Sequence, residues 1–224
     1  MIKPVIRTIF VDFGNVCATF DGQRFLDNFS KTTGVPHSMI VAALFGETND
    51  GRGSLYSERF EALECGRIAP AKFFHELVKV LDCVGRIDYD TFARFWVDIF
   101  DTENTALDQL LAQLPQEKYL LSNTNIIVYT RHMAHSTIVR NHFPSSDRQI
   151  MSYRIGEIKP NPIIYSMALK LARVRAENAL FIDDLPENIE SWRNMGGHGI
   201  VYHAGKNSIA ELEAALCSFG LLAS

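Results

Sequence analysis

Residues 8–15 read TIFVDFGN and give the first strong indication of the fold. The first four are almost continuously apolar and rich in β-branched side chains, as expected of a strand that is buried on both faces. The run stops at Asp12, and a polar turn through Gly14 and Asn15 follows. In open α/β sheets, ligands bind at the carboxyl ends of the strands. This stretch therefore predicts a buried strand that delivers a carboxylate to a ligand site.

Short apolar runs alternate with helical patterns in the second half of the chain. Asn161 is expected to cap one of the helices, and Ser208 fits the capping box of the last. Strands are predicted at 119–121, 149–151, 179–182 and 199–202, and helices at about 107–114, 126–135, 162–171 and 186–195. Strands that alternate with helices predict an α/β fold with a doubly wound parallel sheet.

Residues from about 24 to 99 break this alternation, because they contain helical patterns and no convincing strand. We interpret this stretch as a small all-helical cap domain inserted after the first strand. The cap is expected at residues 19–101, and the core domain at residues 1–18 and 102–224. The loop 46–54, which contains Gly51 and Gly53, is expected to be mobile.

Composition and charge exclude several classes of protein. The 224 residues are 47% hydrophobic and 21% charged, which excludes intrinsic disorder. The net charge is −4 and no Lys/Arg-rich run occurs, so no nucleic-acid partner is expected. No apolar stretch approaches the ~20 residues of a membrane span, so we expect no membrane association and a cytoplasmic location. The four cysteines include no C-x-x-C pair and are expected to be free thiols. The oligomeric state stays open.

Charged and polar side chains recur just after the predicted strands. Asp12, Ser122, Asp183 and Asp184 each follow a strand, and Lys159 lies in a loop before a helix. Three carboxylates would repel one another and one lysine neutralises only one of them, so a hard divalent cation such as Mg²⁺ would complete the balance. A metal beside a hydroxyl, backbone amides and a lysine is an arrangement for binding phosphoryl groups, and one carboxylate could attack phosphorus. The residues thus predict metal-assisted phosphoryl transfer.

Four motifs in this order resemble those of the haloacid dehalogenase (HAD) superfamily of hydrolases. They are residues 10–16 (FVDFGNV), 121–125 (LSNTN), 159–162 (KPNP) and 181–188 (FIDDLPEN). The resemblance implies a Rossmann-like core with a helical cap, and a Mg²⁺-dependent phosphatase that acts on small phosphorylated metabolites through an aspartyl-phosphate intermediate. The Asp-x-Gly-Asn-Val form also resembles a branch that includes a bacterial glucose-1-phosphate phosphatase.

The resemblance implies roles for the residues that contact the phosphate. Asp12 would be the nucleophile, and Lys159 would bridge Asp12 and the phosphate. Ser122 and the backbone amide of Asn123 would hold the phosphate.

The resemblance also implies a Mg²⁺ site formed by Asp12, the backbone carbonyl of Gly14, and Asp183. Asp184 would be either a further ligand or a residue that supports the ligands. Asn15 would either orient its loop or meet the substrate.

Gly14 departs from the pattern, because phosphatases of this superfamily usually carry an aspartate there as general acid. General acid catalysis is typically worth about 10²–10⁴ in rate, so poor leaving groups would suffer most. An anomeric sugar phosphate leaves as a more acidic hemiacetal and is therefore the favoured substrate. Asp21 is either a replacement carboxylate or a solvated residue at the cap hinge. Arg52 and Tyr56 are candidates for substrate contact from the cap.

Two other functions stay open. A 2-haloacid dehalogenase shares the fold and the aspartate nucleophile but uses no metal, and the adjacent Asp183 and Asp184 argue against it. A non-catalytic binding or regulatory protein is favoured only by Gly14. The intact Asp12 and Lys159 argue against that class, because an unused site has no reason to keep a costly charge cluster.

Overall fold

A central sheet of five parallel strands organises the protein, whose computed structural model describes residues 4–46 and 57–222. The strand order is β5-β4-β1-β6-β7. The strands are β1 (Thr8–Val11), β4 (Glu117–Ser122), β5 (Gln149–Met151), β6 (Ala179–Asp183) and β7 (His198–Val201). Each predicted strand is present within one or two residues, and the predicted α/β fold with a parallel sheet is confirmed.

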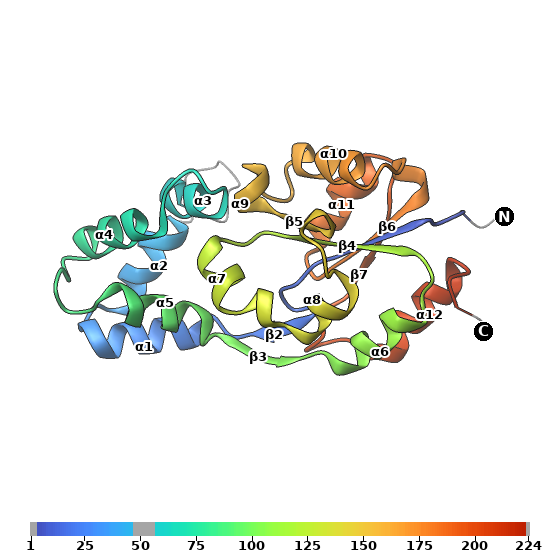
Figure 1. Cartoon of the computed structure of the whole chain (residues 1–224). Coiled ribbons are helices and arrows are strands. Elements are labelled where there is room, and N and C mark those ends of the chain that lie inside the picture. The colour runs from blue at the N-terminus through green and yellow to red at the C-terminus, as the bar shows by residue number, and fades with distance from the viewer. Residues whose placement is uncertain (1–3, 47–56, 223–224) are drawn as a thin grey trace.

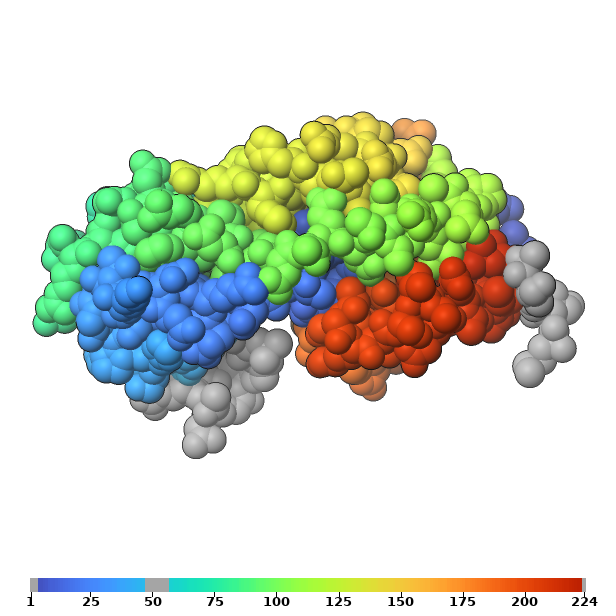
Figure 2. Space-filling model, turned by 90° about the horizontal axis from the view of Figure 1, so that it is seen from below, coloured from blue at the N-terminus to red at the C-terminus, as the bar shows by residue number. Residues whose placement is uncertain are grey.

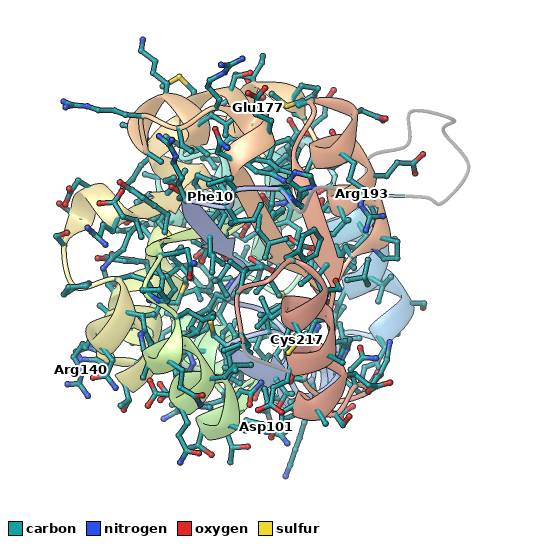
Figure 3. All side chains as sticks on the ribbon, turned by 90° about the vertical axis from the view of Figure 1, so that its right-hand side faces the viewer. Phe10, Asp101, Arg140, Glu177, Arg193 and Cys217 are labelled. Carbon is teal, nitrogen blue, oxygen red and sulfur yellow. The ribbon has the colours of Figure 1, made fainter. Side chains whose placement is uncertain are left out.

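Helices cover both faces of this sheet (Figure 1). On one side lie α10 (Pro162–Leu171) and α11 (Pro186–Asn194); on the other lie α6 (Thr105–Gln113), α8 (Thr137–His142) and α12 (Ile209–Ser218). Successive strand side chains point to opposite faces. Phe10 therefore packs with Trp192 of α11, whereas its neighbours Ile9 and Val11 belong to the core of the other face. Figure 3 shows Phe10 between the two layers, seen from the end where both termini lie.

Five helices lie together beyond the carboxyl ends of the strands (Figure 1). They are α1 (Gln23–Thr33), α2 (His37–Phe45), α3 (Glu58–Glu64), α4 (Pro70–Val80) and α5 (Tyr89–Val97), and we call them the cap helices. Seen from below, the surface is indented between these helices and α12 (Figure 2). As predicted, no strand lies within the described part of 24–99; residues 47–54 of the predicted loop, with Arg52 and Tyr56, fall outside the described residues.

Aromatic rings hold the cap helices together. Trp96 lies at the centre, with ring centroids 4.9 Å from Phe25, 5.4 Å from Phe60, 5.7 Å from Phe73 and 5.1 Å from Phe92. Such edge-to-face and tilted pairs contribute about 0.5–1.5 kcal/mol each beyond the burial of their area. The cap helices therefore have an aromatic core of their own.

Two short strands were not predicted. β2 (Ala18–Phe20) pairs antiparallel with β3 (Phe100–Glu103) and links the two ends of the helical stretch. Both strands are partly exposed, and β3 reads FDTE, so neither shows the apolar alternation by which a strand is recognised in a sequence.

The predicted helix 126–135 is shorter than expected. Helix α7 covers only Ile126–Arg131, and a 3₁₀ turn follows at Met133–His135. Ser136 then caps α8, which was not predicted, by accepting a hydrogen bond from Val139 N. The remaining short elements are α9 (Ser152–Ile155) and the 3₁₀ turns Ser146–Arg148 and Ala176–Asn178.

Smaller predictions are confirmed. Asn161 caps α10, Ser208 and Glu211 form the capping box of α12, and none of the four cysteines is in a disulfide bond. No helix in the described part of the chain is both long and apolar enough to cross a membrane.

Candidate active site

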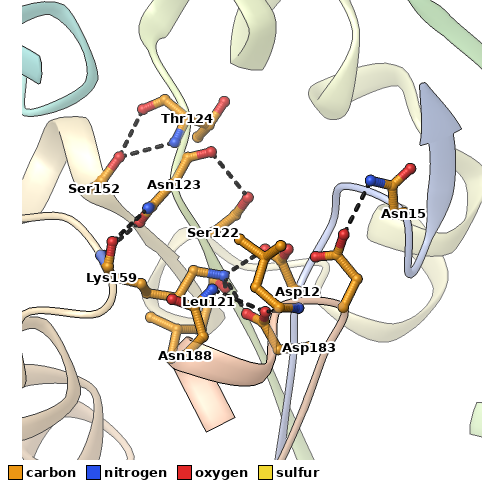
Figure 4. Close-up of polar contacts among 12 residues, drawn as sticks. Asp12, Asn15, Leu121, Ser122, Asn123, Thr124, Ser152, Lys159, Asp183 and Asn188 are labelled. Atoms are coloured by element: carbon orange, nitrogen blue, oxygen red, sulfur yellow. Dashed lines mark hydrogen bonds and ion pairs between the residues drawn. The ribbon is translucent and has the colours of Figure 1, made fainter. Parts of the chain in front are cut away.

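Three adjacent strands deliver the predicted residues to one edge of the sheet. Asp12 follows β1 directly, Ser122 ends β4 and Asp183 ends β6. Because β1 lies between β4 and β6 and all three are parallel, their carboxyl ends meet (Figure 4). Lys159 reaches the same point from the loop before α10. The structure thus brings together four residues, of which the first and the last lie more than 100 positions apart in the sequence.

Lys159 is the central cation of this site. Its Nζ lies 2.8 Å from Asp12 Oδ1 and donates hydrogen bonds to Asp183 Oδ2 at 2.7 Å and to the carbonyl of Leu121 at 3.1 Å. These contacts use all three protons of an ammonium group. Burial of Lys159 opposes its charge, but Asp12 and Asp183 outweigh burial and raise the pKa of Lys159. The lysine is therefore a fixed positive charge between two carboxylates.

The three carboxylates form a compact negative cluster. Oxygen atoms of Asp12, Asp183 and Asp184 all lie within 4.8 Å of one another. Burial, together with repulsion from the other two carboxylates, raises the pKa of Asp12 to about 7, against the opposing effect of Lys159. Burial and the charge of Asp183 likewise raise the pKa of Asp184. One lysine does not balance three carboxylates, so the site has an excess of negative charge.

Hydrogen bonds from neighbouring polar groups fix the carboxylates of Asp183 and Asp184. Asp183 is fully buried, and its Oδ1 accepts hydrogen bonds from Asn188 Nδ2 at 2.8 Å and from Leu185 N at 2.9 Å. Asp184 Oδ2 accepts a hydrogen bond from Asn15 Nδ2 at 3.0 Å. Asn15 adopts a left-handed conformation with φ 54°, which asparagine tolerates better than most residues. The turn after β1 therefore orients Asp184.

The loop after β4 is tied to the lysine loop by paired hydrogen bonds. Asn123 Nδ2 donates to the carbonyl of Lys159 at 2.9 Å, and Lys159 N donates to Asn123 Oδ1 at 2.8 Å. Thr124 N donates to Ser152 Oγ at 2.8 Å (Figure 4). The side chain of Asn123 is therefore committed to the lysine loop, next to the buried Ser122.

The donor set fits a hard divalent cation. Asp12 Oδ1 is buried and, apart from its ion pair with Lys159, has no hydrogen-bond partner among the described residues. Carboxylate and carbonyl oxygens are the ligands that Mg²⁺ prefers, and no histidine or cysteine belongs to the cluster. A dication would cancel the two negative charges that Lys159 leaves uncompensated.

Gly14 has no side chain and therefore provides no general acid at this position. A Cβ built on Gly14 would lie 3.1 Å from Phe20 Cε1, the far end of a half-exposed side chain. Asp21 does not fill this place: Asp21 Oδ1 accepts a hydrogen bond from Gln23 N, and about half of the side chain is exposed. The structure therefore favours a turn-capping role for Asp21.

A buried carboxyl from the cap helices was not foreseen. Glu64, the last residue of α3, is 5% exposed, and its Oε1 accepts a hydrogen bond from Asn125 Nδ2 at 2.6 Å. Ser152 Oγ also lies 2.7 Å from the backbone carbonyl of Glu64. Burial raises the pKa of Glu64 to about 7, against the opposing hydrogen bond from Asn125. The only signal in the sequence is that Glu64 lies four residues after Phe60, on the apolar face of α3.

A cavity of about 420 Å³ lies between the cap helices and this edge of the sheet. Gly14, Ser122 and Asn123 line its core side, and Glu64 and Trp96 belong to the wall formed by the cap helices. Its volume is in the range typical of sites for small molecules. Three of the predicted phosphate-binding residues, Gly14, Ser122 and Asn123, therefore face the same cavity as the cap helices.

No family model matches the chain. A D-ribitol-5-phosphate phosphatase from Bacteroides thetaiotaomicron is 25% identical over 196 residues, which cover 86% of this chain and 89% of that protein. A HAD family enzyme from Bacteroides thetaiotaomicron, solved with magnesium and inorganic phosphate, has a TM-score of 0.77 at 21% identity and covers 92% of this chain and 98% of that one. The chain therefore shares the fold of HAD family enzymes, and its four motifs resemble those of that superfamily. A HAD-like hydrolase from Porphyromonas gingivalis has a TM-score of 0.76 at 22% identity, with coverage of 95% and 98%.

The similarity to HAD family enzymes agrees with the positions of the four motifs. Their residues end β1, β4 and β6 or lie in the loop before α10, and all of them face the same edge of the sheet. Gly14 and Glu64 are the two features that the general HAD pattern does not account for.

Proposed function

We propose that this chain is a Mg²⁺-dependent phosphatase of small phosphate monoesters that forms an aspartyl phosphate on Asp12. One observation carries the proposal: three carboxylates lie within 4.8 Å of one another around a single buried lysine, beside an oxygen- and amide-rich loop. Such a site combines a nucleophile with positive charge that stabilises the phosphoryl group.

The chain's own residues supply the steps of the reaction. The Asp12 carboxylate attacks phosphorus, and the bond from phosphorus to the alcohol oxygen breaks with its electron pair on that oxygen. Lys159, held 2.8 Å from Asp12, stabilises the phosphoryl oxygens. Ser122 and the amide of Asn123 bind the phosphate. Water then cleaves the aspartyl phosphate and restores Asp12.

Asp12, Asp183, Asp184 and the carbonyl of Gly14 are the residues that would hold the metal. When bound, Mg²⁺ supplies positive charge that lets the phosphate approach a carboxylate. Asn188 and Asn15 keep Asp183 and Asp184 in position through the hydrogen bonds described above. Asn15 thus acts on the site by orienting Asp184.

The relatives support this proposal. One of them is named as a phosphatase of a sugar-alcohol phosphate, and a structural neighbour was solved with magnesium and phosphate. We further propose that residues 19–101 act as a cap over the core formed by 1–18 and 102–224, and that the protein works in the cytoplasm.

The test is phosphate release from a panel of phosphate monoesters, with Mg²⁺ and with EDTA. The panel contains D-ribitol 5-phosphate, glucose 1-phosphate, acetyl phosphate and phenyl phosphate. We expect release that requires Mg²⁺ and that Asp12→Asn abolishes. Asp21→Asn is the matched control, because it neutralises an exposed carboxylate on the same segment and should leave the rate unchanged.

A folded sample that releases no phosphate from any ester would contradict the proposal. Chloride release from 2-chloropropionate without Mg²⁺ would instead indicate a dehalogenase.

A further inference from the structure

The cavity next to the phosphate loop has an apolar, aromatic wall. Its rings and aliphatic side chains come from β2, β3 and four of the cap helices, so the wall is assembled from several elements. The main contributors are Phe20, Phe25, Leu44, Phe60, Trp96 and Phe100. This wall belongs to the same cavity as Gly14, Ser122 and Asn123, so a bound phosphate places the rest of its ester against it.

The wall is fixed by contacts among its own rings. Trp96 lies edge to face with Phe25 and Phe60, at centroid distances of 4.9 and 5.4 Å. Phe20 and Phe100, on the paired strands β2 and β3, have ring centroids 5.9 Å apart. Rings that support one another form a preformed surface for a flat apolar group.

The polar side chains of the cavity are mostly committed to other partners. The side-chain carboxamide of Asn123 is paired with the backbone of Lys159: its Nδ2 donates to the carbonyl of Lys159, and its Oδ1 accepts from Lys159 N. Asn125 accepts hydrogen bonds from two backbone N–H groups and donates to Glu64. The raised pKa of Glu64, about 7, means that this carboxyl is at least half protonated at pH 7 and below. The several hydroxyls of a sugar phosphate would lose their hydrogen bonds to water and find few replacement partners among the described residues of the cavity, which is unfavourable for each unpaired group.

The lack of a side chain at Gly14 independently favours an aromatic alcohol as the leaving group. Without a general acid, the leaving oxygen must depart as an anion, which favours acidic alcohols. A phenol, with a pKa of about 10 as in tyrosine, is far more acidic than a primary alcohol. An aromatic alcohol therefore both packs against the apolar wall and can leave without a proton donor.

We propose that the substrate is the phosphate monoester of an aromatic alcohol, with its ring against the wall formed by Phe20, Trp96 and Phe100 and its phosphate at Ser122 and Lys159. Asp12 attacks phosphorus, and the bond from phosphorus to the aryl oxygen breaks to release a phenolate. This inference rests on the proposed phosphatase function and names its substrate class. It replaces the anomeric sugar phosphates that the sequence favoured.

The first arm of the test separates apolar contact from leaving-group acidity. Phenyl, 4-methylphenyl, 4-ethylphenyl and 4-propylphenyl phosphate have leaving groups of nearly equal acidity but increasing apolar length. We expect kcat/KM to rise by about fourfold per methylene, the factor that corresponds to about 0.8 kcal/mol. 4-(Hydroxymethyl)phenyl phosphate, which matches the ethyl compound in size, should lose that gain.

The second arm tests the leaving group and the wall. Benzyl phosphate is an isomer of 4-methylphenyl phosphate with a far less acidic alcohol, and we expect it to react more slowly by at least about 10²-fold. Phe20→Ala should reduce the gain per methylene to below about twofold, because it removes one ring of the wall. Phe95→Ala is the matched control: Phe95 is partly buried on α5 but does not line the cavity, so the gain should persist.

The outcomes separate this inference from the proposed function. Mg²⁺-dependent hydrolysis that is fastest for D-ribitol 5-phosphate or glucose 1-phosphate, with no gain along the aryl series, would overturn the substrate class and leave the phosphatase intact. No Mg²⁺-dependent hydrolysis of any ester would overturn both.

Discussion

Glu64→Gln tests the buried carboxyl that the cap helices present to the cavity. The substitution keeps the size of the side chain and its Oε1, which accepts the hydrogen bond from Asn125 at 2.6 Å. It removes only the ability to become charged. If Glu64 is as buried as the structure shows, the difference in stability between the two proteins depends on pH.

The magnitude follows from the pKa of Glu64 in the folded and unfolded chain. Burial raises this pKa from 4.5 to about 7, so the folded protein binds the proton more tightly than the unfolded chain does. The stabilisation by the protonated form is complete below pH 4.5 and is lost as the pH rises through 7. At about 1.4 kcal/mol per pKa unit, the full change is about 3 kcal/mol.

The assay is urea unfolding of both proteins between pH 4 and 8.5 without metal. We expect the free energy of unfolding of Glu64→Gln, relative to the unmodified protein, to increase by about 3 kcal/mol from pH 4.5 to 8. Other titrating groups, such as Asp12, are present in both proteins and cancel in the difference. Glu61→Gln is the matched control on the same helix, because Glu61 is partly exposed and pairs with Arg67 at 3.4 Å. A difference that stays constant over this pH range would refute the burial of Glu64.

Three further predictions concern the charge cluster, the cap–core contact and Gly14. Lys159→Met leaves buried carboxylates without their cation, so in EDTA the free energy of unfolding should fall by about 3–5 kcal/mol. Mg²⁺ should then raise the Tm of this variant more than that of the unmodified protein. Equal rises in Tm for the two proteins would argue against the metal site. Gly66→Ala should destabilise the protein well beyond the about 1–3 kcal/mol of backbone strain, because its Cβ would lie 2.2 Å from the carbonyl oxygen of Tyr153. Gly85→Ala, also at positive φ but with nothing within 4 Å, should show the strain alone in the same urea titration. Gly14→Asp should raise kcat for alkyl phosphates towards the about 10²–10⁴-fold typical of general acid catalysis, and an equal effect of Gly14→Asn would exclude proton donation as the cause.

Much of the sheet could be predicted because each strand carries its own local signal. The strands β1 and β6 are apolar at every position but the ends, and each is closed by an aspartate. Helix caps such as Asn161 and Ser208 are equally local, since each accepts a hydrogen bond from a residue two or three positions on. The parallel order of the strands then brings Asp12, Ser122 and Asp183 to one edge without further information.

The sequence by itself therefore determined the sheet, the edge at which we propose that the ligand binds, and the residues of the charge cluster. Only the tertiary structure showed the buried environment of Glu64, because its partner Asn125 lies 61 positions away and Ser152 lies 88 away. The aromatic wall was likewise decided by packing: Phe20, Trp96 and Phe100 read as ordinary apolar residues, and a sequence pattern does not distinguish a ring that fills a core from one that borders a cavity. Periodicity records which residues leave water, whereas the shape of the space between them depends on contacts between distant segments.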